Sequence, residues 1–244
     1  YYPGYNIHYR YLDKKYVEFH NVDDVLLRDF IGVCKTEFGL NGVVEKGDGY
    51  SRARVYSSAL SEFFSHVFKV PIGDKSGVIY LPDFVLSSSD EHVSSLLGGL
   101  FDCDGYVCNM TAVKNGKNYL EYSTKSRRLV NQLPFLLMRF GIVSHVKTGK
   151  YNSLFIYGKE NSIKFFDHIC LHSEKKRSRL EEISTGMTVP FSQIDLYPGM
   201  GKTIKEIREE SGLSRIIFAD KTNLSPRVIR FYESGGRLPS RHSL

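Results

Sequence analysis

The sequence has no apolar run near the roughly 18 residues of a membrane-spanning helix, and its N-terminus lacks the basic-then-apolar pattern of a signal peptide. No cysteine belongs to a Cys-x-x-Cys pair or has a histidine at metal-ligand spacing. A structural zinc site is therefore disfavoured, and buried free thiols in a reducing cytoplasm are expected, with no membrane partner. The four cysteines are Cys34, Cys103, Cys108 and Cys170.

A phosphate-binding loop is also lacking. The string Gly199–Thr203 includes Gly201, Lys202 and Thr203, but the earlier glycine that such a loop requires is replaced by Leu196. Nucleotide binding of that type is excluded.

Basic charge is present in excess and is unevenly distributed. The formal charge is +6 and the isoelectric point is about 9.0. Residues 113–182 contain 14 Lys and Arg against 6 Asp and Glu, and residues 221–244 contain 5 against 1. Such concentration favours a surface that binds a polyanion, although a solvated surface with chance bias is the simpler alternative.

The chain contains an internal repeat at an offset of 102 to 103 residues. Tyr16 corresponds to Tyr119, Phe38-Gly39 recurs as Phe140-Gly141, and Phe63-Phe64 recurs as Phe165-Phe166. The repeat predicts an α+β fold with two pseudo-symmetric αββαββα halves, each a four-stranded antiparallel sheet backed by helices. We expect the first half at residues 1–86 and the second at residues 87–188.

Each copy has the same predicted order of strands and helices. In the first copy, strands are expected at 6–10, 15–20, 43–46 and 52–57, and helices at 23–38 and 59–68. In the second, strands are expected at 106–112, 119–123, 143–147 and 153–157, with a last helix at 161–171. Asn115-Gly116 predicts a hairpin turn, and Pro134 is expected to start or kink the helix before Gly141.

Between the copies lies a motif of nine residues, Leu97 to Gly105, at the end of a predicted helix that Ser88 or Ser89 caps. Gly98 and Gly99 each disfavour a helix by about 1 kcal/mol relative to alanine. Close approach of a second helix is the natural compensation. The helix then ends in an acidic residue and a glycine, which places Asp104 at the edge of the next sheet.

These nine residues resemble the LAGLIDADG motif of homing endonucleases, and residues 5 to 185 are similar to the endonuclease region of archaeal inteins. The resemblance implies that two motif helices pack side by side, and that the last acidic residue of each holds Mg²⁺ between the scissile phosphates. Here that residue is Asp104. The residues that match the motif are Leu97, Gly99, Leu100, Asp102, Asp104 and Gly105.

The resemblance also implies a lysine near each catalytic centre, after the last helix of each half. The matching residues are Lys75 and Lys176, which would stabilise charge on the phosphate; solvated lysines on loops are the alternative. Further lysines on or near the strands are expected to contact the DNA backbone. These are Lys114, Lys125, Lys147 and Lys150.

The repeat offset places the acidic residue of a first motif at about position 1, where Tyr1 stands. We therefore expect the first motif helix to belong to the remainder of a longer precursor. No splicing block is recognised in the sequence, so intein origin follows from the resemblance alone.

The C-terminal segment predicts three short helices at 202–210, 214–221 and 225–234, which form a DNA-binding domain at residues 199–244. Its pattern resembles the helix-turn-helix domains of repressors. That resemblance implies that 225–234 is the recognition helix and that Arg227 and Arg230 contact bases or phosphates. A packing module that does not bind DNA is the alternative.

The sequence therefore predicts an enzyme associated with the nucleoid: a Mg²⁺-dependent endonuclease that makes a site-specific double-strand break at a long asymmetric DNA site. One alternative is a DNA-binding regulator or a degenerate relic that no longer cleaves. Another is an RNA-binding splicing helper on the same scaffold.

Overall fold

A computed structural model describes residues 5–10, 14–47, 50–73, 76–110, 118–186 and 196–240, with side chains from residue 15 onward apart from that of Tyr50. The chain divides into two compact units, residues 1–188 and 189–244. The first unit contains two cores, one built from residues between Val17 and Val70 and the other from residues between Ile79 and Ile183.

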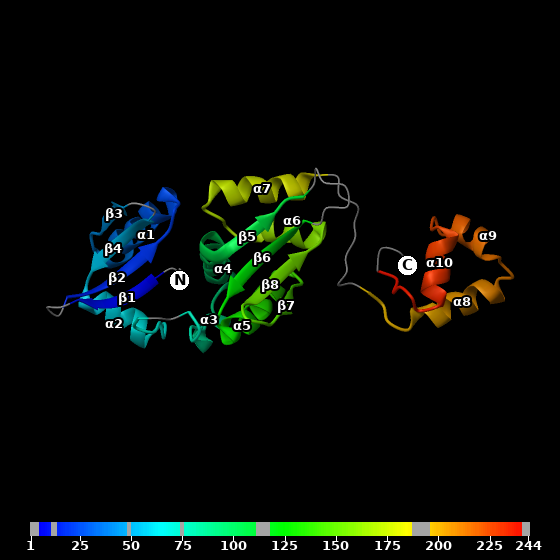
Figure 1. Cartoon of the computed structure of the whole chain (residues 1–244), viewed down its shortest axis with the longest axis horizontal. Helices are drawn as coiled ribbons and strands as arrows, with labels where there is room; N and C mark the ends of the chain where they lie inside the picture. Colours follow the sequence, from blue (N-terminus) through cyan, green and yellow to red (C-terminus); the bar gives the residue numbers. More distant parts are fainter. Residues whose placement is uncertain are drawn as a thin grey trace. The chain divides into compact units, whose positions relative to one another are not determined.

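The N-terminal half contains one antiparallel sheet, sheet A, with strand order β1-β2-β4-β3 (Figure 1). The register pairs Tyr16 of β2 with Tyr56 of β4 and Glu18 of β2 with Arg54 of β4. The elements are β1 (Tyr5–Arg10), β2 (Lys14–His20), α1 (Asp24–Phe38), β3 (Val43–Gly47), β4 (Tyr50–Tyr56) and α2 (Ser58–His66).

Helix α1 has both of its ends fixed by local chemistry. The side chain of Asp23 accepts a hydrogen bond from the N–H of Val25 at 3.0 Å. At the other end, Gly39 adopts φ 67°, a conformation that glycine tolerates without steric cost. The helix buries Leu26, Leu27, Phe30 and Cys34 against sheet A.

The C-terminal half repeats this arrangement in sheet B, with strand order β5-β6-β8-β7. Ser89 caps the motif helix α4 by accepting a hydrogen bond from the N–H of His92. The elements are α3 (Asp83–Leu86), α4 (Asp90–Asp104), β5 (Gly105–Cys108), β6 (Tyr119–Thr124), α5 (Arg127–Met138), β7 (His145–Lys147), β8 (Asn152–Tyr157), α6 (Lys159–His168) and α7 (Glu174–Thr185).

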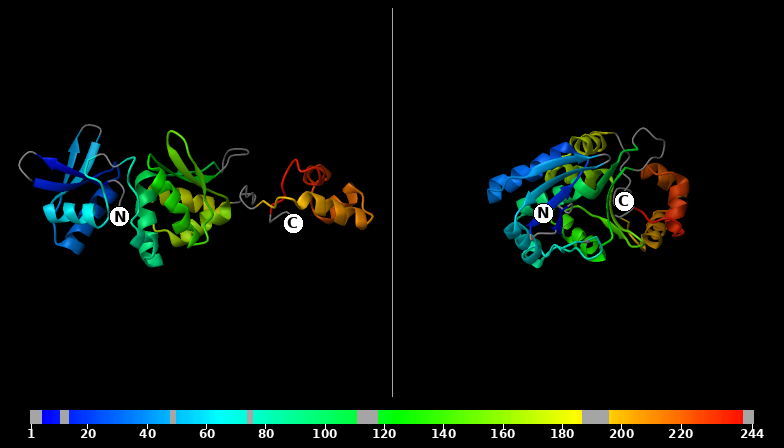
Figure 2. Two further views of the ribbon diagram at one scale, coloured as in Figure 1. Left: turned by 90° about the horizontal axis from the view of Figure 1, so that it is seen from below. Right: turned by 60° about the vertical axis from the view of Figure 1, so that its left-hand side comes forward.

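In each half the helices lie on one side of the sheet (Figure 2). Side chains alternate along the strands, so Val17 and Phe19 enter the core under sheet A, and Leu120 and Tyr122 enter the core under sheet B. The intervening side chains lie on the opposite face of each sheet, which no described helix covers. The α+β prediction of two four-stranded antiparallel sheets backed by helices is confirmed.

Of the two alternatives predicted for Pro134, a helix start is excluded. Helix α5 begins at Arg127, capped by Ser126, so Pro134 stands inside the helix and does not start it. Leu133, Leu136 and Leu137 are all buried around it. Burial of these leucines offsets the roughly 3 kcal/mol that an internal proline costs a helix. A kink at Pro134 stays a prediction.

The cysteine prediction is partly corrected. All four thiols are free, and Cys34 and Cys108 are buried as expected, but Cys103 is only partly buried and Cys170 is exposed. Cys170 lies in the α6–α7 loop, where its backbone rather than its side chain packs inward.

The second unit contains three short helices, α8 (Met200–Glu210), α9 (Arg215–Lys221) and α10 (Pro226–Glu233). Ser214 and Ser225 cap the second and third helices, as the predicted boundaries required. Ile204, Ala219, Ile229 and Tyr232 form the buried centre.

Several predicted features lie outside the described residues: the first-motif position near Tyr1, Lys75, Lys114 and the Asn115-Gly116 hairpin. Among the helices that the structure describes, none is long and apolar enough to cross a membrane.

Candidate nucleic-acid interface and catalytic carboxylate

Asp104 is the last residue of helix α4, and its side chain is exposed. The helix ends because Gly105 turns into an extended conformation, φ −82° and ψ 151°, and begins β5. The last turn contains no basic residue. The negative end of the helix dipole therefore lies beside Asp104.

Asp102, two residues earlier, is buried with 2% of its surface exposed. Its carboxylate accepts hydrogen bonds from the N–H groups of His172 at 2.8 Å and Ser173 at 3.1 Å. Burial raises the pKa of Asp102, while these two hydrogen bonds oppose the rise. Asp102 thus fastens the α6–α7 loop to the motif helix, whereas Asp104 faces solvent.

Lys176 lies in the first turn of α7, a helix beyond the last one predicted, which ended at residue 171. Its ammonium group donates to the carbonyl oxygens of Phe101 at 2.8 Å and Asp102 at 2.7 Å. It therefore caps the C-terminal end of α4. Burial lowers the pKa of Lys176, and the nearby charges of Asp102 and Asp104 oppose that change.

The sequence contained a usable signal for α7. Ser173 and Glu174 form a helix start, and Leu180 and Ile183 are spaced on one face and buried. The helix places Lys176 beside the end of the motif helix, as the family resemblance expected. Its role in catalysis stays a prediction.

The expectation for Gly98 is corrected. A Cβ atom at this position would lie 2.0 Å from the carbonyl oxygen of Cys170, so the close neighbour of Gly98 is the α6–α7 loop of the same half, not a second helix. Gly99 is buried, as are Leu97 and Leu100. The motif residues Leu97, Gly98, Gly99 and Leu100 therefore serve packing, whereas Asp102 holds the α6–α7 loop.

The predicted DNA-binding lysines on sheet B gather at one end of it. Lys147 of β7 pairs with Ser153, Lys125 directly follows Thr124, and Lys150 lies in the β7–β8 hairpin. All three lysines are exposed. β5 begins at Gly105, so this end is also the end at which Asp104 lies.

The outer face of sheet A, called face A, is stabilised by ion pairs. Glu18 is 3% exposed and accepts hydrogen bonds from Arg54 and His20. Arg54 also reaches Glu45 at 3.2 Å, and its guanidinium lies 4.9 Å from the ring centre of Tyr16. Among the side chains that the structure describes, face A comprises Tyr16, Glu18, His20, Val43, Glu45, Arg52, Arg54 and Tyr56.

The outer face of sheet B, called face B, is aromatic where face A is charged. The rings of Phe155 and Tyr157 are stacked at 5.6 Å and 12°, and Tyr119 lies 5.8 Å from Phe155. Face B comprises Tyr106, Cys108, Tyr119, Glu121, Ser123, His145, Lys147, Ser153, Phe155 and Tyr157.

In the second unit, Arg227 and Arg230 are exposed on α10, on either side of Phe231 at 5.6 and 5.8 Å. The opposite side of α10 buries Ile229 and Tyr232.

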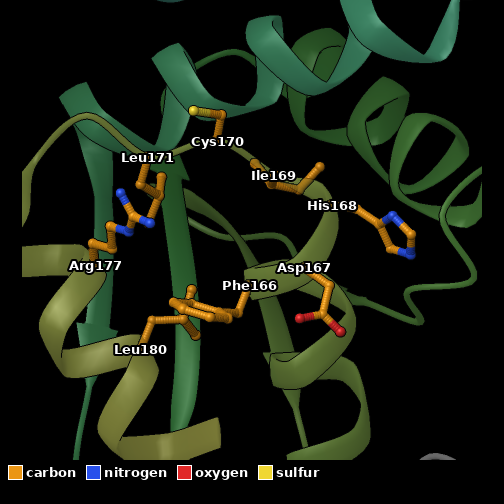
Figure 3. Close-up of a pocket in the computed structure, with 8 residues that line it drawn as sticks. All are labelled: Phe166, Asp167, His168, Ile169, Cys170, Leu171, Arg177 and Leu180. Carbon is orange, nitrogen blue, oxygen red and sulfur yellow. The ribbon is translucent and has the colours of Figure 1, made fainter.

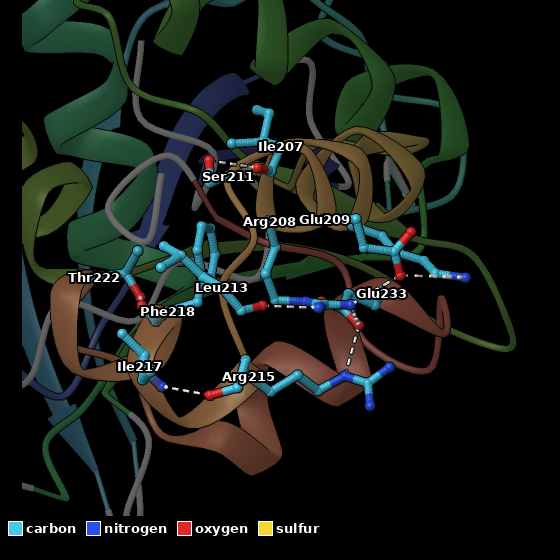
Figure 4. Close-up of polar contacts among 12 residues, drawn as sticks. Ile207, Arg208, Glu209, Ser211, Leu213, Arg215, Ile217, Phe218, Thr222 and Glu233 are labelled. Atoms are coloured by element: carbon cyan, nitrogen blue, oxygen red, sulfur yellow. Dashed lines mark hydrogen bonds and ion pairs between the residues drawn. The ribbon is translucent and has the colours of Figure 1, made fainter.

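A buried carboxylate holds the helices of this unit together (Figure 4). Glu233 accepts hydrogen bonds from Arg208 and, at 2.7 Å, from Arg215. Burial acts to raise the pKa of Glu233, but these hydrogen bonds outweigh it and leave the pKa below its usual range. The ion pairs fix α10 relative to α8 and α9.

A pocket lies beside the α6–α7 loop and includes His168, Cys170 and Arg177 (Figure 3). Asp104 and Lys176 are not among its lining residues. Among the described residues, no cluster of three or more His, Cys, Asp or Glu side chains could hold a metal. Asp104 therefore offers one exposed carboxylate on an open surface, which suits a large substrate that brings ligands of its own.

Comparison with known proteins agrees with this geometry. Residues 91–170 match the LAGLIDADG-like domain family, and residues 204–244 match the helix-turn-helix family. The chain is 28% identical over 210 residues to DNA-directed RNA polymerase subunit Rpo1C of Methanocaldococcus jannaschii, covering 84% of this chain and 23% of that protein. It is 29% identical over 201 residues to glutamine–fructose-6-phosphate aminotransferase of the same organism, covering 77% and 17%. The chain thus spans only a minor part of each relative.

Solved structures give the same fold. Variants of the homing endonuclease I-DmoI match with a TM-score of 0.50 and 15% identity, covering 68% of this chain and 87% of that one. I-DmoI in complex with DNA and Mn matches with a TM-score of 0.50 and 16% identity, covering 71% and 91%. The chain therefore has the fold of the LAGLIDADG homing endonucleases, with a LAGLIDADG-like domain at residues 91–170 and a helix-turn-helix at residues 204–244.

Proposed function

We propose that this chain is the endonuclease part of an intein-type homing element, which makes a site-specific, Mg²⁺-dependent double-strand break in DNA. The observation that carries the proposal is the placement of Asp104. Its exposed carboxylate ends the motif helix where β5 begins, beside the lysine-bearing end of sheet B. A solved relative in fold, I-DmoI, is described in complex with DNA and Mn.

The residues present suit a hard divalent cation. Mg²⁺ is commonly held by one or two carboxylates together with phosphate oxygens and water. When bound, it supplies an acidified water and neutralises charge on the leaving oxygen. Asp104 would hold it, Asp102 fixes the position of the α6–α7 loop, and Lys176 places a positive charge at the end of the motif helix.

DNA binding follows from the surfaces around Asp104. Lys125, Lys147 and Lys150 would contact phosphates and set the position of the duplex. Faces A and B would lie in the major groove on either side of the cleavage site, where two strands of a sheet fit. Because the two faces differ in chemistry, the site they select is asymmetric.

The intein-type origin is supported by the range of relatives. The matching region makes up 23% of an RNA polymerase subunit, 17% of an aminotransferase and 9% of the helicase Hel308 of Methanocaldococcus jannaschii. These three proteins share no activity by name. A segment that recurs as a minor part of unrelated proteins is what an inserted mobile element produces.

A second candidate function is a DNA-binding regulator that does not cleave. The helix-turn-helix at residues 204–244 favours it, because Arg227 and Arg230 are exposed on α10 and an ion pair between Arg215 and Glu233 fixes that helix within the unit. In this function Asp104 would have no chemical role.

The test uses duplexes selected from a randomised library for binding to the chain. We expect Mg²⁺ to permit cleavage of both strands, and Asp104→Asn to reduce the rate by roughly 10³-fold, equivalent to about 4 kcal/mol, with unchanged affinity. Asp167→Asn, the same change at an exposed aspartate on α6, is the matched control and keeps full activity.

Two results would count against the proposal. Cleavage that survives Asp104→Asn would remove the assigned role of this residue. Specific binding by the wild type with no nick in either strand would favour the regulator.

A further inference from the structure

The β2–β4 register of sheet A is equivalent to the β6–β8 register of sheet B, so each outer-face residue of one sheet has a counterpart on the outer face of the other. Three positions are identical in kind on both faces: Tyr16 and Tyr119, Glu18 and Glu121, and Tyr56 and Tyr157. The remaining positions differ. Face A has Arg54, Arg52 and Glu45 where face B has Phe155, Ser153 and Lys147.

The replacement of Arg54 by Phe155 changes the chemistry of the whole face. Without a guanidinium to pair with Glu121, the rings around Phe155 contact one another instead. The centre of Tyr119 lies 6.0 Å from that of Tyr157 and 6.4 Å from that of Tyr106, and Tyr106 is 50% exposed. We call Tyr106, Tyr119, Phe155 and Tyr157 the aromatic cluster.

The major groove of DNA offers one apolar group to such a surface, the C5-methyl of thymine. We propose that the aromatic cluster recognises thymine methyl groups in the half-site bound by sheet B. The inference rests on the proposed function, since it requires sheet B to lie in the major groove. It names the residues that set base preference in that half-site.

The ring geometry supports methyl contact rather than base stacking. Phe155 and Tyr157 lie face to face, and Tyr119 meets Phe155 at 65°. The ring faces are therefore partly covered by neighbouring rings. Unpaired bases stack on free ring faces, whereas the methyl group of a paired thymine needs only a small apolar surface to contact.

The position of the cluster on the sheet predicts where the thymines lie. β5 runs from Gly105, next to Asp104, to Cys108, which pairs with Tyr119, and Tyr119 pairs with Tyr157. Three residue steps span roughly 10 Å. Tyr106 and Phe155 both pair with Glu121 and lie only one residue step from Gly105. At about 3.4 Å per base pair, the thymines therefore lie roughly 1 to 3 base pairs from the phosphate at Asp104.

The experiment replaces thymine with uracil in each half-site of a selected duplex, which removes the methyl group and keeps base pairing. Binding is measured without Mg²⁺. We expect replacement of a contacted thymine in the half-site bound by sheet B to weaken binding by about 3-fold to 4-fold. Replacements in the half-site bound by sheet A should have less than half that effect.

Two matched variants assign the effect to face B. Tyr157→Ser removes a ring of the cluster, and Tyr56→Ser removes the equivalent ring of face A. We expect Tyr157→Ser to abolish the sensitivity to uracil and Tyr56→Ser to preserve it. Tyr106→Ser, at an exposed position, gives the same test if Tyr157→Ser does not fold.

The inference is overturned if uracil has no effect in either half-site, or if the effect persists in both Tyr157→Ser and Tyr106→Ser. It is also overturned if these variants lose affinity for single-stranded DNA or RNA more than for the duplex, since the cluster would then stack unpaired bases. Failure of the proposed function is distinguishable, because the wild type would then either select no duplex at all or bind its duplex without nicking it in Mg²⁺, and neither result depends on the effect of uracil.

Discussion

The two halves of the first unit share a backbone plan but stabilise it differently. Glu18 and Glu121 occupy equivalent positions on the outer faces. Glu18 pairs with Arg54 of β4, and Glu121 pairs with Phe155 of β8. Glu18 is buried by its ion pair with Arg54, whereas Glu121 is partly exposed and accepts a hydrogen bond from Ser123 at 2.9 Å. One partner residue therefore decides whether the same glutamate has a structural role.

Helical glycines show the same contrast. Gly32 of α1 has no atom within 4 Å of the site where a Cβ would stand, but Gly98 of α4 faces the Cys170 carbonyl oxygen at 2.0 Å. A glycine in a helix can thus be neutral in one half and required in the other. The two glycines are not equivalent in the repeat, so this contrast comes from the surroundings of each helix.

The largest expected effect tests the glycine contrast. Gly98→Ala should lower the free energy of unfolding by about 3 kcal/mol, because the backbone of Cys170 cannot move aside cheaply. Gly32→Ala should raise it by up to about 1 kcal/mol, since alanine is the better helix former. Chemical denaturation, with hydrogen exchange to assign the transition, measures both. A Gly98→Ala variant as stable as the wild type would show that this contact is not required.

A smaller effect tests the glutamate contrast. Glu18→Gln should destabilise the N-terminal half by about 2 kcal/mol, because it removes a carboxylate that pairs with the buried Arg54. Glu121→Gln at the equivalent position should change stability by less than about 0.5 kcal/mol. The same denaturation measurement applies, and equal effects in the two variants would remove the distinction between the faces.

The smallest effect is the pH dependence of the stability that the Glu18 carboxylate contributes. Burial acts to raise the pKa of Glu18, but hydrogen bonds from His20 and Arg54 outweigh it and hold the pKa below the usual 4.5. The folded chain therefore binds fewer protons than the unfolded chain just below pH 4.5, so this stabilisation is present above that value and is lost as the pH falls through the folded pKa.

The free energies of unfolding of the wild type and Glu18→Gln, plotted against pH, should therefore converge as the pH falls below about 4.5. Above that pH their difference should stay constant. A gap between the two that widens in acid would contradict the assigned pKa direction.

Much of the fold followed from local signals. The offset between Tyr16 and Tyr119 predicted two equivalent sheets, and alternation along the strands separated core residues from face residues. Asp23, Ser89, Ser214 and Ser225 marked helix starts that the structure confirms. These signals are readable because a cap or a strand period depends on residues within a few positions of one another.

The candidate site was only partly predictable. The family resemblance pointed to Asp104 and Lys176. It did not indicate that Asp102 is buried and holds a loop while Asp104 is exposed. The N–H groups that Asp102 binds lie 70 and 71 residues away, in the α6–α7 loop. The neighbour of Gly98 was also misassigned, because no local pattern specifies which distant backbone approaches a helix.

The sequence by itself determined the order of elements, the two-fold repeat, the basic character and the position of the acidic residue that ends the motif helix. Only the tertiary structure decided which carboxylate is buried, which lysine caps the motif helix and which sheet face is aromatic. The physical reason is that local conformation is set by neighbours in the chain, whereas burial, ion pairing and ring contacts depend on groups that folding brings together from far apart.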